Sequence, residues 1–220
     1  MVGETMSSGT REGWAPKRFP EDRAAAEALN DWVAAGNPQF DGEDLDFRGS
    51  DLSGGDFSAS RFTGANLTGV SAERATFYRA DFSSTDLSGA DLRGADLVKA
   101  EFDETLLRSA RFDGADMGSA TLYAVDAREG VFRGARLSGT TFLESDLRGA
   151  DLSFAVLSEA VLQVTISEAT VLNGVTGTCF GPVVLELSGS LKQLDGPALQ
   201  EWFFHHGGTV EVLAARGRKK

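Results

Sequence analysis

The sequence repeats itself every five residues over more than half of its length. Of the 24 positions from Phe47 to Leu162 whose numbers end in 2 or 7, 22 are Leu, Phe or Met; the exceptions are Ala72 and Ala127. The residue two places before each of these positions has a number that ends in 0 or 5. From 50 to 160, every such residue is Ala, Ser, Thr, Gly or Val. A period of five fits neither a helix nor a simple strand. A period held this long without an insertion predicts a solenoid.

Each five-residue unit has room for a short extended piece and a turn. Several units must therefore complete one circuit before the chain can stack on itself. We expect the large and the small residue of each unit to face a narrow interior. The position between them is often Asp, and the position two after the large residue is often Gly. These two positions are expected to lie outside.

The units "ADLRG" at 90–94 and "ADLSF" at 150–154 resemble the pentapeptide-repeat family, whose unit is A-(D/N)-L-x-x. The resemblance covers about residues 46–175. It implies an all-β solenoid, a right-handed quadrilateral β-helix with four units, or about 20 residues, per coil. It implies far less about function, because the family is functionally diverse.

With this coil length, residues 20 apart stack in four internal columns. Phenylalanine gathers in one of them, which supports the register independently of the resemblance. The column that begins at Phe47 is expected to run through Leu147 to Ser167. We interpret all four columns as core and not as a ligand site. The phenylalanine-rich core ladder consists of Phe62, Phe82, Phe102, Leu122, Phe142 and Leu162.

Both ends of a solenoid need covering. Residues 19–38 predict a capping helix, with Pro20 in its first turn and Leu29, Trp32 and Val33 among the residues on the face toward the first coil. The four predicted segments are a disordered N-terminus at 1–18, the capping helix at 19–38, the β-helix at 39–175, and a C-terminal capping or dimerisation module with a basic tail at 176–220.

Near the C-terminal end, apolar residues replace Asp at outward positions. Such a patch predicts an interface. Strands at 183–187 and 209–213 and a helix at 196–208 could cover it, or a second molecule could. The topoisomerase-acting members that the chain resembles dimerise through a C-terminal module, which implies a homodimer here. The patch and its predicted covering residues are Phe154, Val156, Val161, Val164, Ile166, Val171, Leu199, Trp202 and Phe203.

No arrangement of residues predicts catalysis, a metal site or a cofactor. The only histidines, His205 and His206, fall at the end of the predicted C-terminal helix, where a cation suits the helix dipole. A metal site needs three or four ligands, and no Cys/His cluster supplies them. The single cysteine, Cys179, is expected to be packed and inert.

The formal net charge of −12 argues against direct binding to nucleic acid or to an anionic membrane surface. No apolar run reaches the roughly 20 residues of a membrane helix, and the N-terminus does not look like a signal peptide. We therefore expect a cytoplasmic protein. Residues 41–175 hold 23 acids and 12 basic residues, so the charge is concentrated in the rod.

Two functions stay open at this point. The resemblance to the topoisomerase-interacting, fluoroquinolone-resistance members suggests a DNA mimic that binds DNA gyrase or topoisomerase IV. No projecting loop interrupts 47–162, unlike in the Qnr proteins, which puts drug protection in doubt more than binding. The alternative is a scaffold protein with an unidentified partner. In the mimic, the partner-binding acids would be Asp86, Asp91, Asp96, Asp116, Asp126, Asp146 and Asp151.

Overall fold

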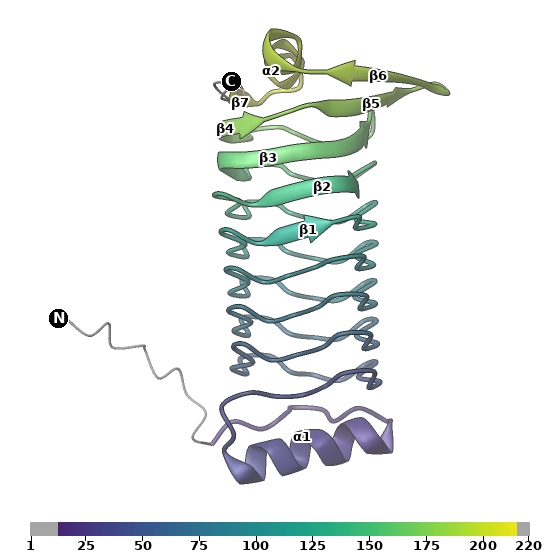
Figure 1. Ribbon diagram of the computed structural model, residues 1–220, viewed down its shortest axis with the longest axis vertical. Helices are drawn as coiled ribbons and strands as arrows, with labels where there is room; N and C mark the ends of the chain where they lie inside the picture. Colours follow the sequence, from purple (N-terminus) through teal and green to yellow (C-terminus); the bar gives the residue numbers. More distant parts are fainter. Residues whose placement is uncertain (1–12, 215–220) are drawn as a thin grey trace, which may run out of the picture.

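The computed structural model describes residues 13–214, which form an upright rod (Figure 1). Helix α1 (Arg23–Ala35) closes one end, and short strands and a second helix close the other (Figure 1). The disorder predicted before residue 13 and the basic tail after residue 214 lie outside the described residues. The other elements are β1 (Thr121–Tyr123), β2 (Thr141–Asp146), β3 (Val156–Ser167), β4 (Thr176–Phe180), β5 (Val183–Leu187), β6 (Ser190–Leu194), α2 (Gly196–His205) and β7 (Thr209–Leu213).

Residues 20 apart are joined by parallel β-bridges, as between Asp86 and Leu106. The N–H of Leu87 donates to the carbonyl of Leu106 at 2.8 Å, and the N–H of Asp86 donates to Ala65 in the coil before it at 3.0 Å. Every coil is thus bonded to the coil on each side. This confirms the predicted right-handed, four-sided β-helix and its register.

A tight turn closes each corner of the coil. In one unit, the N–H of Ala90 donates to the carbonyl of Leu87 at 3.0 Å, and Gly89 between them has φ = 65°. Glycine adopts this left-handed conformation without strain, which explains its frequency at this position. Non-glycine residues also occupy it, as at Lys99 with φ = 60°.

The core ladder is fully enclosed, and its rings stack face to face. The ring centroids of Phe62 and Phe82 are 5.3 Å apart at an interplanar angle of 10°, and those of Phe82 and Phe102 are 5.1 Å apart at 12°. All three side chains have no exposed surface. The spacing of the coils therefore matches the spacing of stacked rings, and the interior is filled with side chains.

Helix α1 extends a neighbouring column of stacked rings, that of Phe57 and Phe77, beyond the first coil. The Trp32 ring stacks on Phe57 at 5.2 Å and 18°. Asp22 caps the helix by accepting a hydrogen bond from the Ala25 N–H, and Gly36 ends it with φ = 62°. The prediction of 19–38 was too long, because the Asp22 cap places Pro20 before the helix.

The predicted position of Val33 was also inexact. Although Val33 belongs to α1, 37% of its surface is exposed. Leu29 and Trp32 are buried as predicted.

Residues 13–18 are not disordered as predicted. The indole N–H of Trp14 donates to the carbonyl of Ser53 at 3.1 Å, and its ring meets Phe57 edge-on at 5.4 Å. Arg18 forms an antiparallel bridge with Asp51. The sequence did not indicate this contact, because residues 13–18 lie outside the repeat.

The register slips by one residue between β2 and β3. Leu143 pairs with Gln163 and Ser145 pairs with Val164, so Glu144 (φ = 52°) has no counterpart in β3. Every following side chain in that stretch changes sides. Val164 and Ile166 therefore point inward and are only 4% and 5% exposed. Their assignment to an outward patch was wrong, and Ile166 takes the core position predicted for Ser167.

A second slip, at Glu159 between β3 and β4, places Cys179 opposite Ala160 in an inward position. Beyond it, β5 pairs with β3 and forms an antiparallel hairpin with β6, while β7 pairs with β4. Helix α2 then buries Leu199 and Phe203. Trp202 and Phe203 line a small apolar cavity of about 20 Å³ over the last coil. The chain thus covers the end of its own core.

We expect Phe102→Ala to lower the free energy of unfolding by about 3–5 kcal/mol, because it interrupts the stacked column and leaves a cavity. Leu106→Ala in the same coil is the matched control; that side chain is 41% exposed and should change stability by less than about 1 kcal/mol. Urea unfolding of both variants measures the difference. Equal effects would contradict the core assignment.

Cys179 should resist thiol reagents in the folded protein. Burial raises the pKa of this thiol to about 12, so at pH 8 only about one molecule in ten thousand carries the reactive thiolate. We expect no reaction of the native chain and one thiol per chain after unfolding, measured with a chromogenic disulfide reagent. Ser190→Cys, at an exposed position, provides the reactive control. Rapid labelling of native wild-type chain would show that the thiol is accessible.

Candidate functional site: an acidic face of the rod

The seven predicted partner-binding acids share a structural role that the sequence analysis missed. Each carboxylate accepts a hydrogen bond from the backbone N–H two residues later, as between Asp86 and Ser88 at 2.9 Å. This bond fixes the start of the turn. All seven are partly buried. The other six bonds are Asp91–Arg93, Asp96–Val98, Asp116–Gly118, Asp126–Arg128, Asp146–Arg148 and Asp151–Ser153.

The fold distributes these seven acids over three sides of the rod. Asp126 and Asp146 stack in one column, and Asp86 lies in the same column two coils before Asp126. A second column holds Asp91 and Asp151, and a third holds Asp96 and Asp116. The structure therefore does not bring the predicted acids together into one surface.

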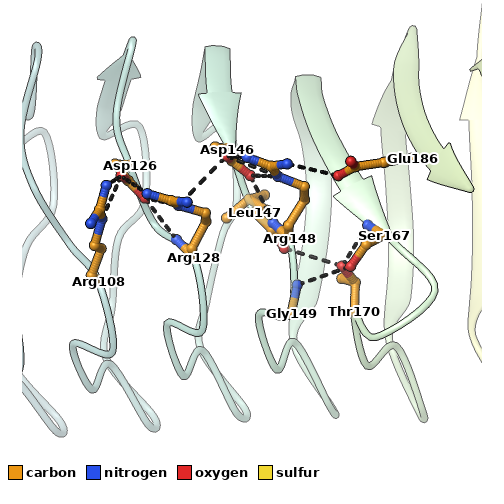
Figure 2. Close-up of polar contacts among 10 residues, drawn as sticks. All are labelled: Arg108, Asp126, Arg128, Asp146, Leu147, Arg148, Gly149, Ser167, Thr170 and Glu186. Atoms are coloured by element: carbon orange, nitrogen blue, oxygen red, sulfur yellow. Dashed lines mark hydrogen bonds and ion pairs between the residues drawn. The ribbon is translucent and has the colours of Figure 1, made fainter. Parts of the chain in front are cut away.

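Arginines compensate much of their charge, as Figure 2 shows for one side. Asp126 lies between Arg108 and Arg128, with contacts of 2.6 and 2.9 Å. Hydrogen bonds from Arg128 and Arg108 hold the pKa of Asp126 well below its ordinary value. The series continues through Asp146 to Arg148. It is a neutral ladder and not an acidic surface.

The ladder also joins the C-terminal module to the rod. Arg148 reaches across to Glu186 of β5 at 2.7 Å (Figure 2). Beside it, the Thr170 hydroxyl donates to the carbonyl of Leu147 at 3.1 Å, and the N–H of Gly149 donates to the Ser167 hydroxyl at 3.2 Å. These bonds hold the chain in place where the register slips.

The other two sides have both close and loose ion pairs. Asp91 contacts Arg93 at 2.6 Å, whereas Asp116 is 3.4 Å from Arg136 and Asp151 is 3.6 Å from Arg133. Within residues 13–214, Asp86 and Asp96 are the two of the seven without an ion pair.

The fourth side holds most of the uncompensated charge. The outward-facing residues Asp81, Glu101 and Thr121 of this side stack in one column, joined by successive β-bridges. Its turn residues stack in the same way, because the N–H of Glu104 donates to the carbonyl of Tyr123 at 2.8 Å. We call this side the acidic face and define it by Asp41, Glu43, Asp44, Asp81, Glu101, Asp103, Glu104 and Glu144.

The acidic face has a single arginine, Arg61, which pairs with Asp41 and Glu43 at 3.0 and 2.7 Å. Farther along the rod, Glu101, Asp103 and Glu104 are exposed, and no cation of residues 13–214 pairs with them.

The pKa of Tyr123 responds to the negative charges of the acidic face. Its hydroxyl donates to Glu144 at 3.3 Å. The charge of Glu144 and this hydrogen bond, with smaller contributions from Glu104 and Asp103, raise the pKa of Tyr123. Glu144, Glu104 and Asp103 thus all act on the same hydroxyl group.

The acidic face was detectable in the sequence but was not found there. The prediction concentrated on the position that carries Asp in the repeat motif, so it did not consider turn residues such as Asp103 and Glu104. Adding charge separately along each side of the 20-residue coil would have found it, because each of the other three sides carries nearly as many basic residues as acids.

The remaining candidate groups have ordinary roles. The His206 ring contacts the carbonyl of Trp202 at 2.7 Å, and His205 lies 3.6 Å from Glu201 on the surface of α2. In the described part of the chain, no three His, Cys, Asp or Glu side chains are placed to hold a metal ion.

Comparison with known structures finds several pentapeptide repeat proteins of low sequence identity. Rfr23, a pentapeptide repeat protein of the cyanobacterium Cyanothece 51142, is 19% identical, with 66% of this chain and 96% of that chain covered and a TM-score of 0.46. HetL of Nostoc, involved in heterocyst differentiation regulation, is 21% identical over 83% and 92% of the two chains, with a TM-score of 0.33.

The full-length fluoroquinolone resistance protein QnrB1, which is plasmid-mediated, is 21% identical over 80% and 82%, with a TM-score of 0.28. At such identities and TM-scores the likeness says nothing about a partner. No curated protein matches the chain.

The family model for pentapeptide repeats (8 copies) matches residues 43–77, 56–94, 85–122 and 131–163, which together make up just over half of the chain. These are the residues that build the four-sided coils. The chain therefore belongs to the pentapeptide-repeat family.

Proposed function

We propose that the protein is a non-enzymatic binding protein whose acidic face docks on a basic, DNA-binding surface of a protein partner. The first partner to test is DNA gyrase, or topoisomerase IV, with protection from gyrase-targeting antibiotics as the biological result. The observation that supports this is the uncompensated charge on one side of a rigid rod. Such a field attracts a positively charged groove and orients the rod within it.

The density of this charge is close to that of a nucleic acid strand. From Asp41 to Glu144 the acidic face holds eight acids and one arginine. About five coils at about 4.8 Å give a length near 25 Å, or one net charge per roughly 3.5 Å. One strand of duplex DNA carries one charge per about 3.4 Å. The acidic face thus resembles one strand, although its acids are unevenly spaced.

A scaffold role for an unidentified partner is the second candidate. It is favoured by the turn-capping bonds of the seven repeat aspartates, because a carboxylate that the fold needs carries no information about a partner. The two candidates differ in what the acidic face does. In a DNA mimic it makes the contact, whereas in a scaffold it serves solubility alone.

We expect the purified protein to alter supercoiling by DNA gyrase, with and without a quinolone. The triple variant Glu101→Gln, Asp103→Asn, Glu104→Gln should lose at least tenfold in potency, because it removes three unpaired charges from the acidic face. The control, Glu129→Gln, Glu159→Gln, Glu168→Gln, removes the same charge from exposed positions on other sides and should keep full potency.

Equal losses in the two triple variants would mean that net charge matters and the acidic face does not. A wild-type chain that neither binds nor affects gyrase would exclude the gyrase proposal. Capture of a partner other than a topoisomerase by wild type and triple variant alike would favour the scaffold.

We further propose a homodimer formed through the C-terminal end. The chain covers its own core there, but apolar side chains remain on the outside: Phe154, Val156 and Val171 are 57%, 41% and 43% exposed. Leu191 in the hairpin and Phe204 on α2 are 72% and 74% exposed. Single exposed residues are common, but five at one end support a contact surface.

Sedimentation or mass photometry at micromolar concentration should give twice the mass of the chain. Phe204→Glu should convert it to a monomer without unfolding it, because the side chain is exposed. Glu201→Lys on the same helix is a control that leaves the apolar surface intact. A wild-type monomer at these concentrations would disprove the dimer.

A further inference from the structure

Strand β7 forms an edge of the sheet at the C-terminal end of the rod, next to α2 (Figure 1). In the described part of the chain it pairs with β4 alone. The N–H of Thr209 donates to the carbonyl of Val175 at 2.7 Å, so Thr209 is bonded on the β4 side. Successive residues of a parallel strand direct their backbone groups to opposite sides. Glu211 therefore also faces β4, whereas Val210 and Val212 face the free edge.

Helix α2 satisfies only one of the two residues at this edge. The N–H of Val212 donates to the Oε1 atom of Gln200 at 3.1 Å, which confirms that Val212 is directed away from β4. The N–H and the carbonyl of Val210 have no hydrogen-bond partner among residues 13–214. Backbone groups of a largely buried residue rarely lack a partner, and an unpaired strand edge is a template for another chain.

A groove of about 420 Å³ lies between α2 and β7 and includes this edge. Val210 lines the groove although its side chain belongs to the apolar core and the residue is only 5% exposed. It is therefore the backbone of Val210 that borders the groove. Gln200 and the ring of Phe204 line it from α2, and Phe204 is 74% exposed. The volume is within the range of about 300–1,000 Å³ that is common for ligand sites.

We propose that this groove binds an extended, basic peptide segment of a protein partner, which forms backbone hydrogen bonds with Val210. An extended peptide is the occupant because its backbone presents N–H and C=O groups with the spacing that a strand edge requires. Side chains on one face of the segment would pack against the exposed ring of Phe204, and those on the other face would point to solvent.

Charge complementarity selects a basic segment. The two charged side chains that line the groove are both acids, Glu201 and Glu211, and both are exposed. Of residues 13–214, His205, at 3.6 Å from Glu201, is the one basic residue within ion-pair distance of either acid. A lysine or arginine of the bound segment would face these carboxylates, whereas an acidic segment would be repelled.

This site is separate from the acidic face and does not depend on the gyrase proposal. It shares Phe204 with the proposed homodimer contact, so a bound peptide and a second copy would compete for the C-terminal end. That consequence rests on the proposed homodimer. A second copy seated in the groove is the rival occupant, and the exchange of the Val210 amide hydrogen distinguishes the two.

Amide hydrogen exchange, followed residue by residue, tests the site in the full chain. In the chain alone, the Val210 amide should exchange faster than those of Thr209 and Glu211, which bond to β4. The probe is a synthetic octapeptide of alternating valine and lysine. At saturation it should slow exchange at Val210 at least tenfold. The same octapeptide with a methyl group on every backbone nitrogen keeps its charge but cannot donate hydrogen bonds, and it should bind at least tenfold more weakly.

The double variant Glu201→Lys, Glu211→Lys should bind the octapeptide at least tenfold more weakly, measured by fluorescence anisotropy. Both side chains are exposed, so the variant should fold normally. The charge-matched control, Glu129→Lys with Glu168→Lys, changes exposed acids on another side and should bind as the wild type does. The triple variant of the acidic face should also bind normally, which separates this site from the proposed gyrase contact.

Three results would overturn the proposal. The first is exchange at Val210 that the octapeptide does not change. The second is equal binding of the octapeptide and its methylated form, or equal losses in the two double variants, because either would reduce the interaction to general charge attraction. The third is protection of Val210 without peptide that increases with protein concentration, because it would assign the groove to a second copy.

Discussion

The whole structure depends on a match between two spacings. Strands of neighbouring coils lie about 4.8 Å apart, and the phenylalanine rings of the core ladder stack with centroids 5.1–5.3 Å apart. Backbone hydrogen bonds and side-chain stacking therefore favour the same rise per coil. Because each unit contributes one large and one small inward residue, neither can change size without disturbing the coils above and below.

This geometry explains why the acidic motif of the repeat says little about function. Asp is favoured at the start of each turn because its carboxylate accepts the N–H two residues later, as Asp86 does from Ser88. In the proposed function, the contact with a partner is made instead at positions whose side chains the turn does not use, such as Asp103. There the side chain is exposed, and its charge has no structural partner within the described residues.

Much of the fold could be predicted from the sequence because the inward positions tolerate almost no exceptions. The stacking of Phe62 on Phe82 follows from the period alone. The slip after Glu144 could not be predicted in this way. One residue is missing from an apolar stretch, and this leaves the composition of the stretch unchanged. It nevertheless turns Val164 and Ile166 inward. Trp14 was missed because its contacts with Ser53 and Phe57 are long-range and follow no repeat. The acidic face was missed because it emerges only when turn residues are sorted by side.

The coil-to-coil bridges also determine how such a molecule can change length during evolution. Duplicating 20 residues inside the regular region adds one coil, and each strand still finds a partner in the same register. The caps at α1 and α2 are unaffected, because each contacts the coils at its own end. Any side of the rod can therefore be lengthened in steps of about 4.8 Å, with its pattern of charges shifted as a block. The length of the rod can therefore change by whole coils while the residues of the two ends stay the same.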